Sequence, residues 1–179
     1  MKIISGNFKG RSILINKKDN FRPTLSRIRE DLFNIIAHNK DISINLENVT
    51  FCDLFCGSGS IGLEALSRGA KKVIFNDINK RNLKIIKRFL DEIKFKKYSL
   101  YNEDAYSKSK EVLNNSNIVY VDPPYSDNIN FFSQSIYKSA PESCLIIFET
   151  EQNFEHSDLI LVKRYKNKNL FFLKKTNET

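Results

Sequence analysis

The segment Ile118-Val-Tyr-Val-Asp-Pro-Pro-Tyr125 changes character halfway along its length. Its first four residues are β-branched or aromatic and predict a buried strand. Pro123 and Pro124 end that strand, because proline has a fixed φ and no amide hydrogen for a sheet ladder. Asp122, the Pro123 carbonyl and the Tyr125 ring are therefore predicted to lie together at a strand's carboxyl end, where open α/β sheets bind their ligands.

A second strand and a glycine loop come earlier in the chain. Residues 49–55 are mostly apolar, and Cys56-Gly-Ser-Gly-Ser-Ile-Gly62 matches GxGxxG, with Asp77 standing 20 residues after Gly57. This spacing also fits a nicotinamide dinucleotide fold. Asp53 favours a different ligand, because a carboxylate there would repel a pyrophosphate. It would attract the cationic amino and sulfonium groups of S-adenosylmethionine, whose ribose hydroxyls could donate to Asp77.

Helices and strands alternate along the remaining chain. Helices are predicted from Arg22-Pro-Thr24 through the apolar stripe ending at residue 36, from the glycine loop to about residue 69, and over 80–93, 106–114 and 128–139. Further strands are predicted over 73–77, 98–101 and 143–150, with a closing hairpin of strands over 159–165 and 170–174. This alternation predicts a Rossmann-like α/β fold with a mostly parallel seven-stranded sheet and helices on both faces.

Asp104 follows the strand predicted over 98–101, in the turn Asn102-Glu-Asp104. At the same sheet edge as Asp53 and Asp77, its carboxylate could accept a hydrogen bond from the adenine amino group of the donor. A turn carboxylate without a ligand is the alternative.

The composition is that of one soluble globular domain. The chain has 179 residues, of which 41% are hydrophobic and 28% charged, which suits a single full core. No apolar run approaches the roughly 20 residues of a membrane span, and the first residues turn polar before a signal-peptide core could form. We expect a cytoplasmic monomer with no membrane partner. Cys52, Cys56 and Cys144 lack paired spacing, so we expect buried thiols and no metal site.

Positive charge is concentrated at the two ends of the chain. Residues 1–31 hold eight Lys or Arg against three acidic residues, and residues 152–179 hold six against three, whereas residues 32–151 are neutral. A basic arm beside a neutral core predicts a polyanionic substrate, nucleic acid first. A proteome that is rich in lysine is the alternative, although this would raise the charge along the whole chain.

The first 45 residues are predicted to form a nucleic-acid-binding arm, and residues 46–179 the catalytic core. Residues 2–15 predict a β-hairpin whose turn carries two cations beside Phe8. A helix follows, and its arginines outside the apolar stripe can form forked contacts to phosphate or stack on bases; a solvated helix face is the alternative. The predicted RNA contacts are Lys9, Arg11, Arg22, Arg27 and Arg29.

Asp53 with the glycine loop, Asp77 and the Asp122-Pro-Pro-Tyr125 corner together resemble class I S-adenosylmethionine-dependent methyltransferases that act on exocyclic amines. A tighter resemblance, to the bacterial RsmD family, extends from residue 2 to about residue 151. The motifs that carry it are Gly6-Asn-Phe-Lys-Gly-Arg11, Arg22-Pro-Thr24, Arg27-Ile-Arg-Glu30, Leu32-Phe-Asn34, Gly59 to Gly62 and Leu63-Glu-Ala-Leu-Ser-Arg68. The arm motifs are the specific part, because many DNA and RNA methylases share the glycine loop and the Asp-Pro-Pro-Tyr corner.

The resemblance implies methylation of the exocyclic N2 of a guanine, position 966, in small-subunit (16S) ribosomal RNA. It implies a partly or fully assembled subunit as partner. The cofactor positions that it implies are Asp53, Gly57, Gly59, Asp77 and Asp104, with Phe33 and Asn34 bordering the donor, and the catalytic motif is Asp122, Pro123, Pro124 and Tyr125. Phe89, where family members often have Asn, and the final hairpin, which lacks the usual glycine, depart from the family pattern.

The chemistry of the corner suits transfer to an aromatic amine. The Asp122 carboxylate and the Pro123 carbonyl would accept the two amino hydrogens and direct the nitrogen lone pair toward the methyl group. Tyr125 would stack on a base taken out of its helix. Three rivals remain: a DNA adenine or cytosine amino methyltransferase, a ribosome-assembly binding protein without activity, and a nicotinamide oxidoreductase, which Asp53 disfavours.

Overall fold

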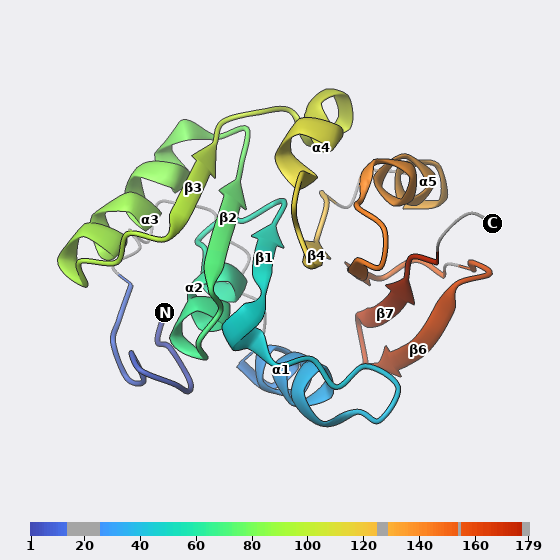
Figure 1. The fold of residues 1–179 in the computed structure, drawn as a ribbon, viewed down its shortest axis with the longest axis horizontal. Helices are drawn as coiled ribbons and strands as arrows, with labels where there is room; N and C mark the ends of the chain where they lie inside the picture. The colour runs from blue at the N-terminus through green and yellow to red at the C-terminus, as the bar shows by residue number, and fades with distance from the viewer. Residues whose placement is uncertain (14–25, 125–128, 154, 177–179) are drawn as a thin grey trace.

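The computed structural model describes residues 1–13, 26–124, 129–153 and 155–176 (Figure 1). Its strands form one sheet in the order β3-β2-β1-β4-β5-β7-β6. The strands are β1 (Thr50–Asp53), β2 (Lys72–Asn76), β3 (Tyr98–Tyr101), β4 (Ile118–Val121), β5 (Leu145–Thr150), β6 (Leu159–Arg164) and β7 (Asn169–Lys174). The helices are α1 (Ser26–His38), α2 (Ser60–Ser67), α3 (Lys80–Glu92), α4 (Ala105–Leu113) and α5 (Ile129–Ser139), with a 3-10 turn over Leu46–Asn48. The predicted mostly parallel, seven-stranded α/β sheet is confirmed.

Strands β1 to β5 pair in parallel, and β7 runs antiparallel between β5 and β6. The order reverses between β1 and β4, which are neighbours although two other strands separate them in sequence. Crevices at such a reversal, outside the carboxyl ends of the strands, are where doubly wound sheets bind ligands. A ligand site is therefore expected at the carboxyl ends of β1 and β4.

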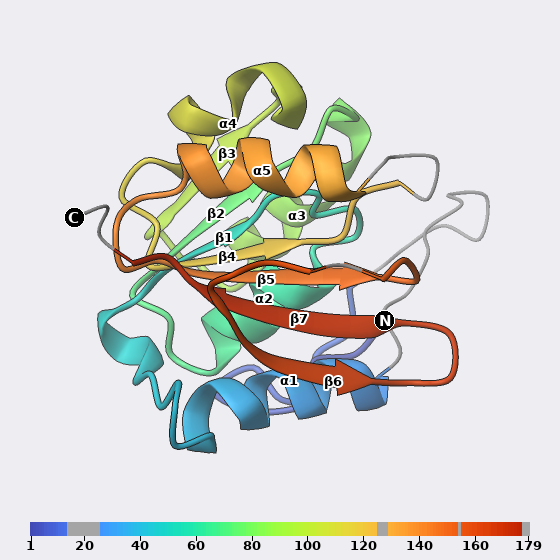
Figure 2. The same ribbon diagram turned by 90° about the vertical axis from the view of Figure 1, so that its right-hand side faces the viewer.

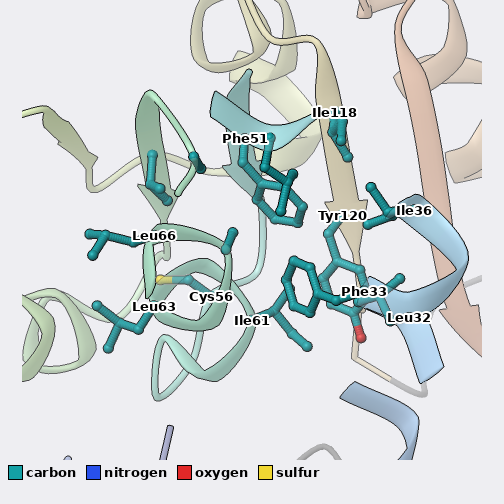
Figure 3. Packing of buried hydrophobic residues seen from close by; sticks show 14 of the residues in the cluster. Leu32, Phe33, Ile36, Phe51, Cys56, Ile61, Leu63, Leu66, Ile118 and Tyr120 are labelled. Atoms are coloured by element: carbon teal, nitrogen blue, oxygen red, sulfur yellow. The ribbon is translucent and has the colours of Figure 1, made fainter. Parts of the chain in front are cut away.

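Helices cover both faces of the sheet, with α4 and α5 on one side and α1 and α2 on the other (Figure 2). Alternate strand residues separate into two hydrophobic cores because successive side chains point to opposite faces. Phe51 packs with α1, α2 and α3, while its neighbour Cys52 packs with α4 and α5. In the first core, Leu32, Phe33 and Ile36 of α1 pack near Phe51 and Tyr120 (Figure 3).

Two glycines, one in the loop after β1 and one in the first turn of α2, are required by geometry. Gly59 caps α2 with φ +76°, a left-handed conformation that L residues rarely adopt. A Cβ on Gly62 would lie 2.3 Å from the Phe75 ring, so only glycine lets α2 pack this closely on β2. Gly59 thus allows the turn into α2, and Gly62 allows the close packing of α2 on β2.

The N-terminal segment differs from the predicted β-hairpin. Residues 1–13 fold back antiparallel, with one bridge between Lys2 and Ser12 and backbone hydrogen bonds from Ile3 to Arg11 and from Ile13 to Met1, whereas residues 14 and 15 lie outside the described part. The reason is that α2 takes the amide hydrogens that a longer ladder would need. Ile4 and Ser5 donate to the Glu64 carboxylate at 2.8 and 3.0 Å. The segment is thus a short antiparallel turn docked on α2, without the longer strands of the predicted hairpin.

The described start of α1 is Ser26, and the predicted helix opening, Arg22-Pro-Thr24, lies outside the described residues. Cys52, Cys56 and Cys144 are buried free thiols, as predicted. Among the described residues, no helix is both long and apolar enough to span a bilayer.

Candidate active site

A cavity of about 470 Å³ opens at the reversal of strand order. Asp53 ends β1 and pairs in register with Tyr120 of β4, so Asp122 follows close to Asp53 at the same sheet edge. The described residues that line the cavity include five acidic residues and no Lys or Arg. The five are Asp53, Asp77, Glu103, Asp104 and Asp122. The volume lies within the range of small-molecule sites, and the charge favours a cationic ligand.

Asp53 is the most buried of these acids, with 2% of its surface exposed. Burial raises the pKa of its carboxyl to about 7, with a smaller raising effect from Asp122, Asp77 and Glu149, while a hydrogen bond from the Gly62 amide opposes the shift. That bond, 2.8 Å long, joins Asp53 to the first turn of α2. A bound cation would therefore stabilise the ionised form of Asp53.

Asp77 organises the loops on the other side of the cavity. Its carboxylate accepts hydrogen bonds from the Gly57 amide at 2.8 Å and from the Asn82 side chain at 2.9 Å. Its second oxygen accepts from the Asn79 amide at 2.7 Å, in the turn that begins α3. Asp77 thus fixes the glycine loop while it lines the cavity beside the exposed Ile78.

Asp104 lines the cavity and caps α4. Its side chain accepts from the Tyr106 amide at 3.0 Å and from the Ser107 hydroxyl at 3.2 Å. A carboxylate has about four acceptor positions, so the cap leaves room for a ligand donor. Tyr106 adds a half-exposed ring to the same wall and packs on Phe132, with ring centroids 4.5 Å apart.

Asp122 and Pro123 line the cavity immediately after β4, with Pro124 beside them. The Lys168 ammonium lies 3.3 and 3.4 Å from the two Asp122 carboxylate oxygens. The same ammonium donates to Glu149, a fully buried residue of β5. Lys168 and Glu149 were missed by sequence reasoning. Glu149 did carry a signal, because it lies near the end of a predicted strand, as Asp53 does.

Several residues that were predicted to contact the methyl donor do not line the cavity. Phe33 and Asn34 of α1 are not among the described residues that line the cavity. Phe33 is buried in the core, and its ring contacts Phe51 and the Arg68 guanidinium. Gly59 also lies outside the lining and acts through the loop shape. Tyr125 falls outside the described residues.

The predicted RNA-contacting side chains divide into two groups. Lys9, Arg11 and Arg27 are exposed, and Arg22 falls outside the described residues. The prediction for Arg29 was wrong, because only 2% of its surface is exposed. Its guanidinium donates to the Lys2 carbonyl at 2.8 Å and lies 3.6 Å from the Glu64 carboxylate. Arg29 is on the inner side of α1, where it holds the N-terminal segment.

The chain is similar in sequence to curated proteins and similar in fold to solved structures. Ribosomal RNA small subunit methyltransferase D of Buchnera aphidicola is 33% identical over 71% of this chain and 64% of its own length. The yhhF protein of Escherichia coli is 25% identical, with a TM-score of 0.80 over 99% of both chains. An RNA methyltransferase of Salinibacter ruber, solved with S-adenosyl-L-homocysteine, shares the fold at 12% identity, with a TM-score of 0.70 over 88% of this chain and 96% of that one.

The chain spans less than two thirds of the length of the Buchnera aphidicola relative. The family model described as conserved hypothetical protein 95 matches residues 1–173, nearly the whole chain. The resemblance to the RsmD family is thereby confirmed. The chain belongs to the family described as conserved hypothetical protein 95, whose curated relatives include ribosomal RNA small subunit methyltransferase D.

Proposed function

We propose that this protein transfers the methyl group of S-adenosylmethionine to the exocyclic N2 of a guanine in small-subunit ribosomal RNA. The observation that carries the proposal is the acidic cavity at the strand reversal, whose described lining holds no Lys or Arg. A dinucleotide would bring a pyrophosphate into this field and be repelled, whereas a sulfonium and an ammonium group would be attracted. Relatives named for small-subunit ribosomal RNA methylation support RNA as the acceptor.

The residues around the cavity divide the work of holding the donor. Asp53 and the glycine loop would face the cationic amino acid end, and Asp77 would accept hydrogen bonds from the ribose hydroxyls. Asp104 would accept from the adenine amino group. The solved neighbour in complex with S-adenosylhomocysteine shares this fold, which supports the same class of ligand.

Asp122 and the Pro123 carbonyl would act on the acceptor. Conjugation with the ring makes the guanine amino group a weak nucleophile, and acceptors on both hydrogens direct its lone pair out of the ring plane. When bound, S-adenosylmethionine supplies an electrophilic methyl group on a cationic sulfonium. Positioning is therefore the main task of the protein. Tyr125 would stack on the extruded base, a contact worth about 1–3 kcal/mol per base.

The direct test is transfer of labelled methyl to under-methylated small ribosomal subunits, to their naked RNA and to duplex DNA in parallel. We expect label in the ribosomal samples, recovered as N2-methylguanine after digestion. Label only in DNA would replace the acceptor in the proposal, and label in another base would reject the guanine assignment. If no sample is labelled and the donor does not bind, the protein is a binding protein without this activity.

The variant Asp122→Ala separates chemistry from donor binding. We expect transfer to fall by at least about 100-fold, because the acceptor loses its positioning group, while affinity for S-adenosylhomocysteine stays within about 3-fold. Asp91→Ala, at an exposed position on α3, is the matched control and should behave as wild type in both measurements. Full transfer by Asp122→Ala would contradict the mechanism.

A further inference from the structure

The turn between β6 and β7 reaches the candidate active site because of the direction of β7. This strand pairs antiparallel with β5, in the register Thr150↔Asn169. Lys168, the residue before β7, therefore lies beside the carboxyl end of β5, next to β4. The turn is closed by a 2.8 Å hydrogen bond from the Tyr165 amide to the Lys168 carbonyl.

Glu149 fixes the Lys168 ammonium in this place. Its carboxylate is fully buried and accepts from Lys168 on one oxygen and from the Tyr120 hydroxyl on the other. The Lys168 side chain itself is 13% exposed. A buried carboxylate needs such partners to remain ionised, so the ammonium has an anchor that does not depend on Asp122.

Lys168 also compensates a cluster of negative charge. The charges of Asp122 and Glu149 both act on Asp53 of β1, and all three acids act on Tyr120 of β4, the strand between β1 and β5. Beyond Glu149, Tyr165 donates to Asp31 of α1 at 3.0 Å. The Lys168 ammonium lies within 3.4 Å of both oxygens of Asp122, so it brings a positive charge against this acidic cluster.

We propose that Lys168, anchored on Glu149, is the positioning residue of Asp122: it holds that carboxylate oriented at the cavity before the base enters. The inference rests on the proposed function, in which Asp122 accepts an amino hydrogen. The contacts of 3.3 and 3.4 Å are long for charge-assisted bonds. A carboxylate with about four acceptor positions can keep this pair and still accept from a base.

Two measurements on Lys168→Met test the proposal. The first is the pH profile of single-turnover methyl transfer to under-methylated small subunits at saturating S-adenosylmethionine, so that the pH-dependent donor binding expected from Asp53 does not set the acid limb. Loss of the ammonium makes protonation of Asp122 easier, so the acid limb should move up by on the order of 1 pH unit, and transfer at neutral pH should fall about 10- to 100-fold. Lys168→Arg should restore the position of the acid limb. Affinity for S-adenosylhomocysteine should stay within about 3-fold of wild type.

The second measurement does not need activity: a carbon NMR titration of the Asp122 carboxyl, assigned by its loss in Asp122→Asn. Its midpoint should rise in Lys168→Met and return in Lys168→Arg. Lys166→Met, an exposed lysine of the same turn, is the matched control and should leave the titration and the acid limb unchanged. Thermal unfolding checks that each variant folds, and Lys168→Gln replaces Lys168→Met if that variant does not.

The outcomes separate the two proposals. A wild type that transfers no methyl to any acceptor rejects the proposed function, and the Asp122 titration still decides the pairing. A wild type that transfers, with the same acid limb and the same titration in Lys168→Met, overturns the role of Lys168. A uniformly lower rate with an unchanged acid limb also overturns it, because the lysine would then only brace the hairpin.

Discussion

At the scale of single residues, Asp53 shows how burial moves the titration of an aspartate to near neutral pH. Its ordinary pKa of 3.8 is raised to about 7, chiefly because the folded chain removes it from water. The native protein therefore holds this proton more tightly than the unfolded chain does. The contribution of Asp53 to the free energy of unfolding therefore decreases as pH rises from about 4 to about 7, without a ligand.

The same shift predicts how donor binding depends on pH. A cationic donor is attracted to the ionised form of Asp53, so affinity for S-adenosylmethionine should increase as pH rises through about 7. Asp53→Asn should weaken binding and remove this dependence. Calorimetric titrations between about pH 5.5 and pH 8.5 check it. A wild-type affinity that is flat over this range would mean that Asp53 does not contact the donor's charge.

At the scale of elements, helix α2 connects the candidate active site with the N-terminal segment. Its first turn binds Asp53 through Gly62, and its opposite side binds residues 4–8 through Glu64 and Ser67. Glu64 is fully buried and neutralised by Arg68 at 2.9 Å and Arg29 at 3.6 Å. The basic segment is thus held on the helix that follows the glycine loop.

Glu64→Ala should undo this attachment. Arg29 would be left as a buried charge without its acid partner, and loss of one member of a buried pair costs about 3–5 kcal/mol. Chemical denaturation measures the cost, and proteolysis of the first residues should become faster. Glu92→Ala removes an exposed carboxylate paired within α3 and should change stability by less than about 1 kcal/mol. Similar effects of the two variants would contradict the role given to Glu64.

At the scale of the whole molecule, the charged surface is divided between an acidic cavity and basic chain ends. We propose that the exposed cations of the N-terminal segment and α1 bind the RNA backbone. Arg11→Ala and Arg27→Ala should each weaken RNA binding and lower the salt dependence by about one counterion per lost phosphate contact. Lys97→Ala, exposed just before β3 at the amino end of the sheet, should not. Salt titrations of RNA affinity measure both quantities. An unchanged slope in both arginine variants would place the RNA surface elsewhere.

Much of this molecule follows from local sequence. Apolar runs of strand character, helical periodicity and the break at Pro123 specify the elements by short-range rules, and parallel pairing brings the carboxyl ends to one edge. Asp53, Asp77, Asp104 and Asp122 were therefore predicted to share an edge, and they line one cavity. Their roles toward a donor and a base remain predictions.

The tertiary structure decided what depends on contacts between distant segments. The Lys168 ammonium reaches Asp122 across 46 positions in the sequence, through the register of β7 on β5. Arg29 is buried because Glu64 and the Lys2 carbonyl meet it from two other segments. Neither the periodicity of a helix nor the composition of a turn predicts such contacts between distant segments. The sequence by itself determined the elements and the edge where their acids meet, and the packing of separate elements determined which charges are buried, paired and raised in pKa.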